Sequence, residues 1–176
     1  MSMSELHKPE WYGECAIISD KYNDYVQIKY KCNGTGTLYD YSLFPGINLI
    51  FMDFNCSDIF HEPIPNKNII EIRHYQKGRV EFELRNNKVF HMKEGELCIN
   101  ALANVPAAYS FPFGYSVGLS CVIDKDSIDA KTKQIFSYYN IDVLNLGQEL
   151  EIEKKWFLCR TPQRLLHIFD ELYRSE

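Results

Sequence analysis

The chain has 176 residues, a length typical of one domain that buries roughly 70% of its unfolded surface around a single core. Hydrophobic residues make up 45% and charged residues 24% of the sequence, and it has only 9 glycines and 7 prolines, which excludes disordered and collagen-like chains. The formal net charge is -5. Because phosphate binding requires an excess of clustered cations, we expect that these residues do not bind DNA by themselves.

Neither a secretory signal nor a membrane segment is expected. Residues 1–10 are polar and lack an apolar stretch, and no run approaches the roughly 18 apolar residues of a membrane helix. The six cysteines contain no CxxC pair and lie mostly in apolar, strand-like runs. We therefore expect reduced core thiols and a cytoplasmic protein.

From about residue 22 to 123 the hydrophobic pattern is that of short strands rich in Tyr, Phe, Ile and Val. The last of these runs, 115–124, alternates in the manner of a half-buried strand. Many short strands at this spacing predict a sandwich or a barrel. The expected turns between them are 33–36, 45–46, 77–78, 86–87, 94–95 and 112–114.

The most informative strand pair is 69–75 with 79–84. A three-residue turn ending at Gly78 would make one face apolar except for His74. The opposite face would then collect charged residues, with Arg73 across from Glu81, as a solvated or inter-sheet ladder.

Beyond Asp124 the period becomes helical. A first helix carries Ile128, Ile135 and Phe136 on one face, and a second begins after Thr161 with Pro162 at its first position. We therefore divide the chain into a β region, 1–123, and a C-terminal helical part of the same domain, 124–176.

Several segments carry a family resemblance: 43–50 (LFPGINLI), 71–75 (EIRHY), 78–81 (GRVE), 94–100 (EGELCIN), 105–106 (VP), 122–124 (VID) and 166–173 (LHIFDELY). Together they resemble the N-terminal sensor domain of AraC-type bacterial transcription regulators. The resemblance implies a cupin-like double-stranded β-helix barrel, here mainly β and followed by two α-helices. It also implies a regulatory domain that senses a small-molecule effector, pairs into a homodimer and precedes a DNA-binding helix-turn-helix region.

The chain ends at Glu176 without that helix-turn-helix region. The last helix has a start signal but no Gly or Asn terminator. The expectation is an excised sensor domain, whose parent would contact DNA only through the absent C-terminal domain.

The competing interpretations are a stand-alone cupin-like binding protein or a degenerate metal-dependent cupin enzyme. A cupin metal site usually takes His-x-His and a carboxylate from one hairpin and another His from a later strand. Ile72 and Gln76 flank His74 at the two-residue spacing, and Tyr109 stands where the later His is expected. We therefore expect no metal and no cofactor.

Catalysis is not expected either. The thiols that could pair with a histidine lie in apolar runs, where burial raises the pKa of a thiol and disfavours the nucleophilic thiolate.

Four side chains are candidates for an effector pocket inside the barrel: His74, Phe82, Tyr109 and Tyr115. Each could instead be ordinary core, because small barrels often fill their interiors with side chains.

The apolar stripe of the last helix is the candidate dimer interface, through Leu165, Phe169, Leu172 and Tyr173. The alternative is that the same stripe packs on the chain's own barrel, as the apolar face of any surface helix does.

Overall fold

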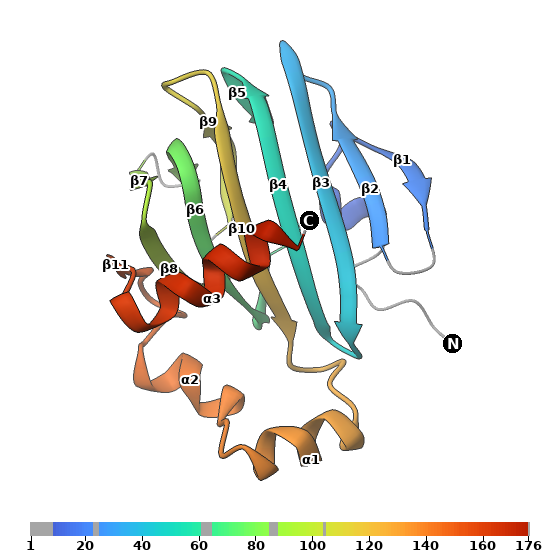
Figure 1. The fold of residues 1–176 in the computed structure, drawn as a ribbon, viewed down its shortest axis with the longest axis vertical. Helices are drawn as coiled ribbons and strands as arrows, with labels where there is room; N and C mark the ends of the chain where they lie inside the picture. Colours follow the sequence, from blue (N-terminus) through green and yellow to red (C-terminus); the bar gives the residue numbers. More distant parts are fainter. Residues whose placement is uncertain (1–8, 23–24, 61–64, 85–87, 104, 176) are drawn as a thin grey trace.

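The computed structural model describes residues 9–22, 25–60, 65–84, 88–103 and 105–175. The described residues form a long antiparallel sheet that curls into a half-barrel, with helices at its C-terminal end (Figure 1). The predicted class, mainly β with C-terminal helices, is confirmed, although there are three α-helices rather than two. No helix among the described residues has the length and apolar character needed to span a membrane.

Among the described residues, the β region begins with a 3-10 turn, η2 (Pro9–Tyr12), and contains ten strands. These are β1 (Ala16–Lys21), β2 (Tyr25–Tyr30), β3 (Gly34–Phe44), β4 (Ile47–Cys56), β5 (Asp58–Phe60), β6 (Asn66–Leu84), β7 (Val89–Lys93), β8 (Glu96–Leu102), β9 (Pro106–Ser110) and β10 (Ser116–Asp124).

The C-terminal part contains α1 (Ala130–Tyr138), α2 (Val143–Glu149), β11 (Phe157–Arg160) and α3 (Gln163–Arg174). Strand β11 was not expected from the sequence, and it pairs with β8 at one edge of the sheet. The order of the main sheet is β1-β2-β3-β4-β10-β6-β8-β11, while β5, β7 and β9 pair off this path. The C-terminal part thus contributes a strand to the same sheet as the β region.

The expected hairpin of 69–75 with 79–84 is wrong, because both runs belong to the single strand β6. The first half of β6 pairs with β10 and β8, and the second half pairs with β7 and β9. The register against β10 shifts at Gln76, which leaves a bulge where the turn was predicted. Gly78 there has φ +87°, and a Cβ atom on it would lie 2.4 Å from the carbonyl oxygen of Tyr115. The glycine therefore serves a bulge against a neighbouring strand rather than a hairpin.

The bulge reverses which side chains of β6 face the barrel interior. Before it, Glu71, Arg73 and Tyr75 point inward; after it, Val80 and Phe82 do so. The predicted Arg73–Glu81 pair does not form: Arg73 instead pairs with Glu71 on its own strand. Arg73 is only 5% exposed, so its assignment to a solvated or inter-sheet ladder is wrong.

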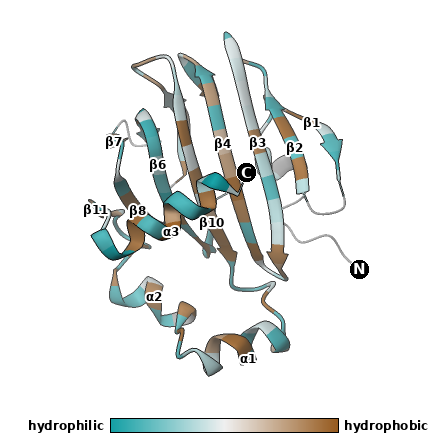
Figure 2. Ribbon diagram, in the orientation of Figure 1, coloured by the Kyte–Doolittle hydropathy of each residue, from teal (hydrophilic) through white to brown (hydrophobic). Residues whose placement is uncertain are grey.

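The sheet is buried on both faces at its centre, where β4 and β10 are largely hydrophobic (Figure 2). The larger core cluster fills the concave interior, and a smaller cluster around Ile70, Ile123 and Ile152 lies on the convex side, where it includes residues of the C-terminal segment. Strand β10 is therefore not half-buried as predicted, since Ser116, Ser120 and Asp124 are also buried.

Candidate functional site

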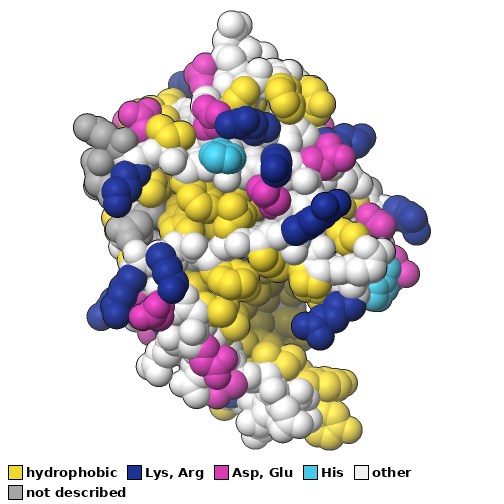
Figure 3. All heavy atoms as spheres, turned by 90° about the vertical axis from the view of Figure 1, so that its left-hand side faces the viewer, with side chains coloured by type: hydrophobic (Ala, Val, Ile, Leu, Met, Phe, Trp, Pro, Cys, Tyr) yellow, Lys and Arg dark blue, Asp and Glu magenta, His cyan; other side chains and the backbone are white. Residues whose placement is uncertain are grey.

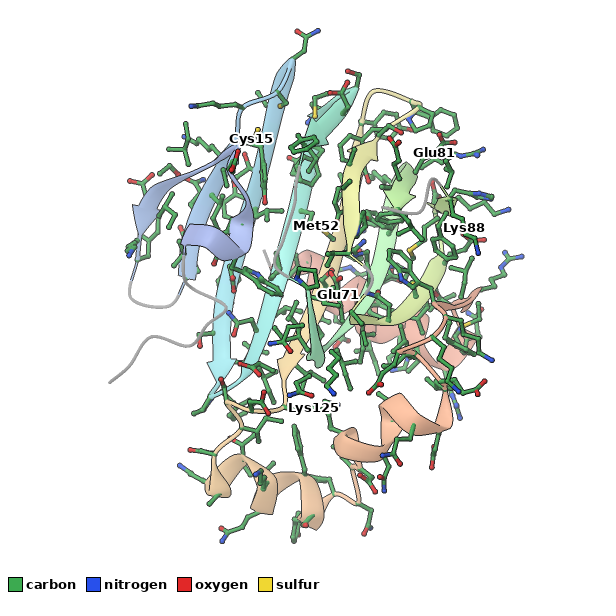
Figure 4. All side chains as sticks on the ribbon, turned by 180° about the vertical axis from the view of Figure 1, so that it is seen from behind. Cys15, Met52, Glu71, Glu81, Lys88 and Lys125 are labelled. Atoms are coloured by element: carbon green, nitrogen blue, oxygen red, sulfur yellow. The ribbon has the colours of Figure 1, made fainter. Side chains whose placement is uncertain are left out.

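The concave interior of the half-barrel contains a cavity of about 60 Å³. Its wall is mostly aromatic and aliphatic, with a small polar group contributed by β6 and β10. The lining residues are Trp11, Tyr12, Tyr30, Leu38, Ile50, Met52, Phe54, Ile59, Glu71, Arg73, Tyr75, Leu102, Tyr109, Phe111, Ser120 and Val122. In the view from behind, the labelled Met52 on β4 and Glu71 on β6 lie on the side of the sheet away from α3 (Figure 4). We call this space the lumen cavity.

The polar group of the lumen cavity is a buried ion pair. Arg73 donates from Nε to Oε1 of Glu71 at 3.1 Å and from Nη2 to Oε2 at 2.6 Å. The hydroxyl of Ser120 donates to the same Oε1 at 2.6 Å. Burial opposes the charge on Arg73, but the neighbouring Glu71 carboxylate outweighs it and holds the pKa of the guanidinium well above its usual value. The pair is therefore ionised and electrically neutral as a unit.

One donor of this ion pair remains unused. Nη1 of Arg73 is buried and makes no hydrogen bond with any part of the chain that the structure describes. The guanidinium carbon lies 4.9 Å from the ring centre of Phe82 and 5.6 Å from that of Tyr109, distances at which aromatic rings attract a cation. These contacts hold the guanidinium in place, but a ring face does not replace a hydrogen-bond acceptor.

A second buried network attaches η2 to the barrel. Asp40 is fully buried and accepts from the Tyr12 hydroxyl at 2.7 Å and from Nδ2 of Asn48 at 2.6 Å. Tyr30 donates to the backbone oxygen of Tyr12 at 3.0 Å. Burial and the nearby Asp40 carboxylate raise the pKa of Tyr12, which keeps its phenol a neutral donor. This network positions Trp11 and Tyr12 in the wall of the lumen cavity.

His74 lies outside the lumen cavity, on the convex face of the sheet beneath α3. Its ring stacks on that of Phe169 with 4.2 Å between centres and 5° between planes. The Tyr173 hydroxyl donates to the backbone oxygen of His74 at 3.1 Å. Nδ1 of His74 lies 3.1 Å from the same hydroxyl. Burial lowers the pKa of His74 to about 4, although Asp170 acts in the opposite direction. The imidazole is therefore a neutral packing group.

The structure brings together only two of the four residues predicted to face a barrel pocket. Tyr109 lines the lumen cavity and Phe82 packs against it and against Arg73. The placement of His74 and Tyr115 in the interior is wrong: His74 packs under α3, and Tyr115 is 43% exposed beside Phe113. The bulge at Gln76 explains the position of His74, because it reverses which side chains of β6 point into the barrel.

Sequence reasoning missed Glu71 and Arg73, the two charged residues that define the site. A signal was present in the run 69–73 (IIEIR), where isoleucines on both sides of the strand indicate burial of both faces. In such a strand charged side chains must be buried and paired.

The four residues predicted at a dimer interface all lie on α3, and each is half-buried. Phe169 stacks on His74, and the ring of Tyr173 lies 6.4 Å from that of Phe51 on β4. Part of the stripe therefore packs on the chain's own sheet, as the alternative interpretation expects. At the edge of the stripe, one turn from both Leu165 and Leu172, Ile168 remains 46% exposed.

The residues that the structure describes contain no group of three or more His, Cys, Asp or Glu side chains placed to hold a metal ion. Burial raises the pKa of the Cys98 thiol to about 12 and that of Cys121 to about 11. A second hollow, of about 510 Å³, is lined by residues from Ile128 to Val143 around α1. On the side of the molecule that lies at the left of Figure 1, hydrophobic side chains gather in a surface hollow (Figure 3).

No family model matches the sequence, and no curated protein matches it. Several solved structures are similar to parts of the chain. An HTH_3 family transcriptional regulator from Vibrio cholerae is 16% identical, with a TM-score of 0.38, over 49% of this chain and 50% of that one. The EutQ protein of Clostridium difficile is 16% identical, with a TM-score of 0.39, over 52% and 71% of the two chains.

A Cupin_2 domain of an XRE family transcriptional regulator from Enterobacter cloacae is 12% identical, with a TM-score of 0.41. That similarity covers 50% of this chain and 94% of the other. These structural neighbours include a Cupin_2 domain, and two of the three belong to transcriptional regulators.

Proposed function

We propose that this chain is a ligand-sensing regulatory domain of the kind found in AraC-type transcription regulators, with no catalysis of its own. The observation that carries the proposal is the unused Nη1 donor of Arg73, buried in the wall of a largely apolar cavity. A buried donor without an acceptor destabilises a protein by about 1–3 kcal/mol, and by more when it is charged. A ligand that accepts from Nη1 would recover that free energy on binding.

The rest of the lumen cavity suits recognition of a small organic molecule. Pockets for such ligands are mainly hydrophobic and aromatic, with a few placed polar groups that fix orientation. Here Phe54 and Phe111, whose rings stack with 4.9 Å between their centres, both line the cavity. The raised thiol pKa values of Cys98 and Cys121 support a non-catalytic role, since a thiol held protonated is a poor nucleophile.

In this proposal the sensor works as a homodimer in the cytoplasm and acts on DNA only through a separate C-terminal domain. All six cysteines are free thiols, which supports a reducing compartment. The exposed Ile168 and the half-buried Leu165 and Leu172 supply apolar area on α3 for pairing.

The test uses the methyl group of Met52, which lines the lumen cavity, as an NMR reporter. The protein is labelled with ¹³C at its methionine methyls and screened against a chemically diverse fragment library that includes molecules small enough for the cavity of about 60 Å³. We expect bound fragments to shift the Met52 signal and leave unshifted that of Met92, which is buried but does not line the cavity. A library that shifts no Met52 signal, or that acts only on other sites, would overturn the proposal.

A further inference from the structure

We propose that the lumen cavity selects a small uncharged molecule with a carbonyl-type oxygen, and that Glu71 is the residue that rejects carboxylates. The inference rests on the proposed function and specifies its ligand class. It follows from three properties of the site: the unused polar group is a hydrogen-bond donor, the site already contains a neutralised ion pair, and the cavity is small.

The unused polar atom of the cavity wall is a donor. Nη1 of Arg73 carries two N–H groups, and it makes no hydrogen bond with the described residues. Oε1 of Glu71 already accepts from Arg73 and from Ser120, and Oε2 accepts from Arg73. The Tyr109 hydroxyl is also engaged with this guanidinium: burial raises the pKa of Tyr109, and the charge of Arg73 and a hydrogen bond with it act in the opposite direction. The ligand must therefore bring the acceptor, and a carbonyl oxygen with two lone pairs matches the two N–H groups.

The charge of the site favours a neutral acceptor. Glu71 and Arg73 are the only charged side chains among the described lining residues, and they neutralise each other at 2.6 Å. A carboxylate on Nη1 would add a second anion beside Glu71 in a water-poor interior, where like charges repel strongly. A guanidinium without a paired carboxylate would bind anions, but this one is already neutralised.

A cationic ligand is disfavoured for the opposite reason. It would face the Arg73 guanidinium, and the Glu71 carboxylate that could attract it is already paired with that guanidinium and accepts from Ser120. The cavity of about 60 Å³ is well below the roughly 150 Å³ of an engineered protein cavity that binds benzene. The occupant is therefore a molecule of a few non-hydrogen atoms with an apolar body.

Three planar molecules of the same shape test the inference: acetamide, acetate and acetamidinium, which are neutral, anionic and cationic. Each is titrated into the wild-type protein at constant ionic strength while the Met52 methyl signal is followed. We expect acetamide to bind with a Kd at least tenfold lower than either ion. Acetate that binds as tightly as acetamide, or more tightly, would overturn the inference.

Two variants locate the origin of the selectivity. Glu71→Gln keeps an oxygen that can accept from Arg73 and removes the negative charge, so acetate should become the tighter ligand. Glu81→Gln removes one negative charge from the same strand at a position that does not line the cavity, and the wild-type order should persist. An unchanged order in folded Glu71→Gln would refute the role of Glu71. If that variant does not fold, the order of the three probes in the wild type decides.

The outcomes also separate this inference from the proposed function. A preference for acetate at Met52 overturns the ligand class and leaves binding in the lumen cavity intact. If none of the three probes shifts the Met52 signal but other library members do, the ligand class is likewise overturned and binding in the lumen cavity is retained. If the whole library leaves Met52 unshifted, both the ligand class and the sensor function are refuted.

Discussion

Acidification should destabilise the fold through His74. The side chain is 4% exposed, and the hydrogen-bond geometry fits a neutral ring. The Tyr173 hydroxyl donates to the backbone oxygen of His74, so Nδ1 is placed to donate to that hydroxyl. Nε2 is buried without a partner among the described residues. Protonation would make Nε2 a donor as well as Nδ1. Unlike Nδ1, Nε2 would be buried without an acceptor, which lowers the stability of the folded state.

The magnitude follows from the pKa of His74, which burial lowers from 6.5 to about 4 against the opposing effect of Asp170. Because the unfolded chain then binds the proton first as the pH falls, this contribution is fully present above about pH 6.5. It is lost progressively toward pH 4 and changes no further below that. A difference of about 2.5 pH units corresponds to about 3 kcal/mol, of which about 2 kcal/mol should be lost between pH 7 and pH 4.5.

The assay is urea unfolding of the wild type and of His74→Gln at several pH values between 7 and 4.5. Subtracting the two free energies of unfolding cancels the titration of every other group. We expect the advantage of the wild type to shrink by about 2 kcal/mol across this range. As a control, His167→Gln at an exposed position of α3 should keep the wild-type pH dependence. Parallel curves for the wild type and His74→Gln would refute the reasoning.

Three further predictions concern the ion pair, the bulge and the last helix. Arg73→Met should lower the free energy of unfolding by about 3–5 kcal/mol because it leaves the buried Glu71 charge unpaired, and the double variant Arg73→Met/Glu71→Leu should recover most of the loss in urea unfolding. No recovery would show that the pair itself stabilises the fold. Gly78→Ala should lower the Tm more than Gly95→Ala. Both positions have a positive φ, which destabilises an alanine by about 1–2 kcal/mol. At Gly78 the new Cβ would also lie 2.4 Å from a backbone oxygen, whereas at Gly95 no atom lies within 4 Å of it. Equal shifts in Tm would contradict the close approach. If α3 pairs two copies, Leu172→Glu should convert a dimer into a folded monomer in light scattering, whereas a monomeric wild type at tens of micromolar would exclude pairing.

The coarse fold could be predicted from local patterns. The turns at 45–46, 94–95 and 112–114 lie where Gly and Pro placed them, because positive φ and the fixed φ of proline are properties of single residues. The change from strand to helix after Asp124 was also visible, and α3 carries the helical period, but Ile128, which was assigned to the first helix, lies before α1. The start of the second predicted helix was shifted slightly: α3 begins at Gln163, and Pro162 rather than Thr161 is its N-cap.

The site could not be predicted from the same patterns, because it depends on a partner strand. The stretch around Gly78 can form a tight turn or a bulge, and both use the same positive φ. Pairing of β6 with β10, which lies about forty residues later in the chain, selects the bulge. That choice moves Glu71 and Arg73 into the barrel and places His74 under α3.

By itself, the sequence determined the fold class: a mainly β chain with C-terminal helices. Its side-chain types and turn residues act over a few positions, and such local preferences are enough for that conclusion. Only the tertiary structure decided which face of β6 is the interior, because the side-chain period of a strand is two and a single inserted residue exchanges its faces. The unused donor of Arg73 exists only as a result of that exchange.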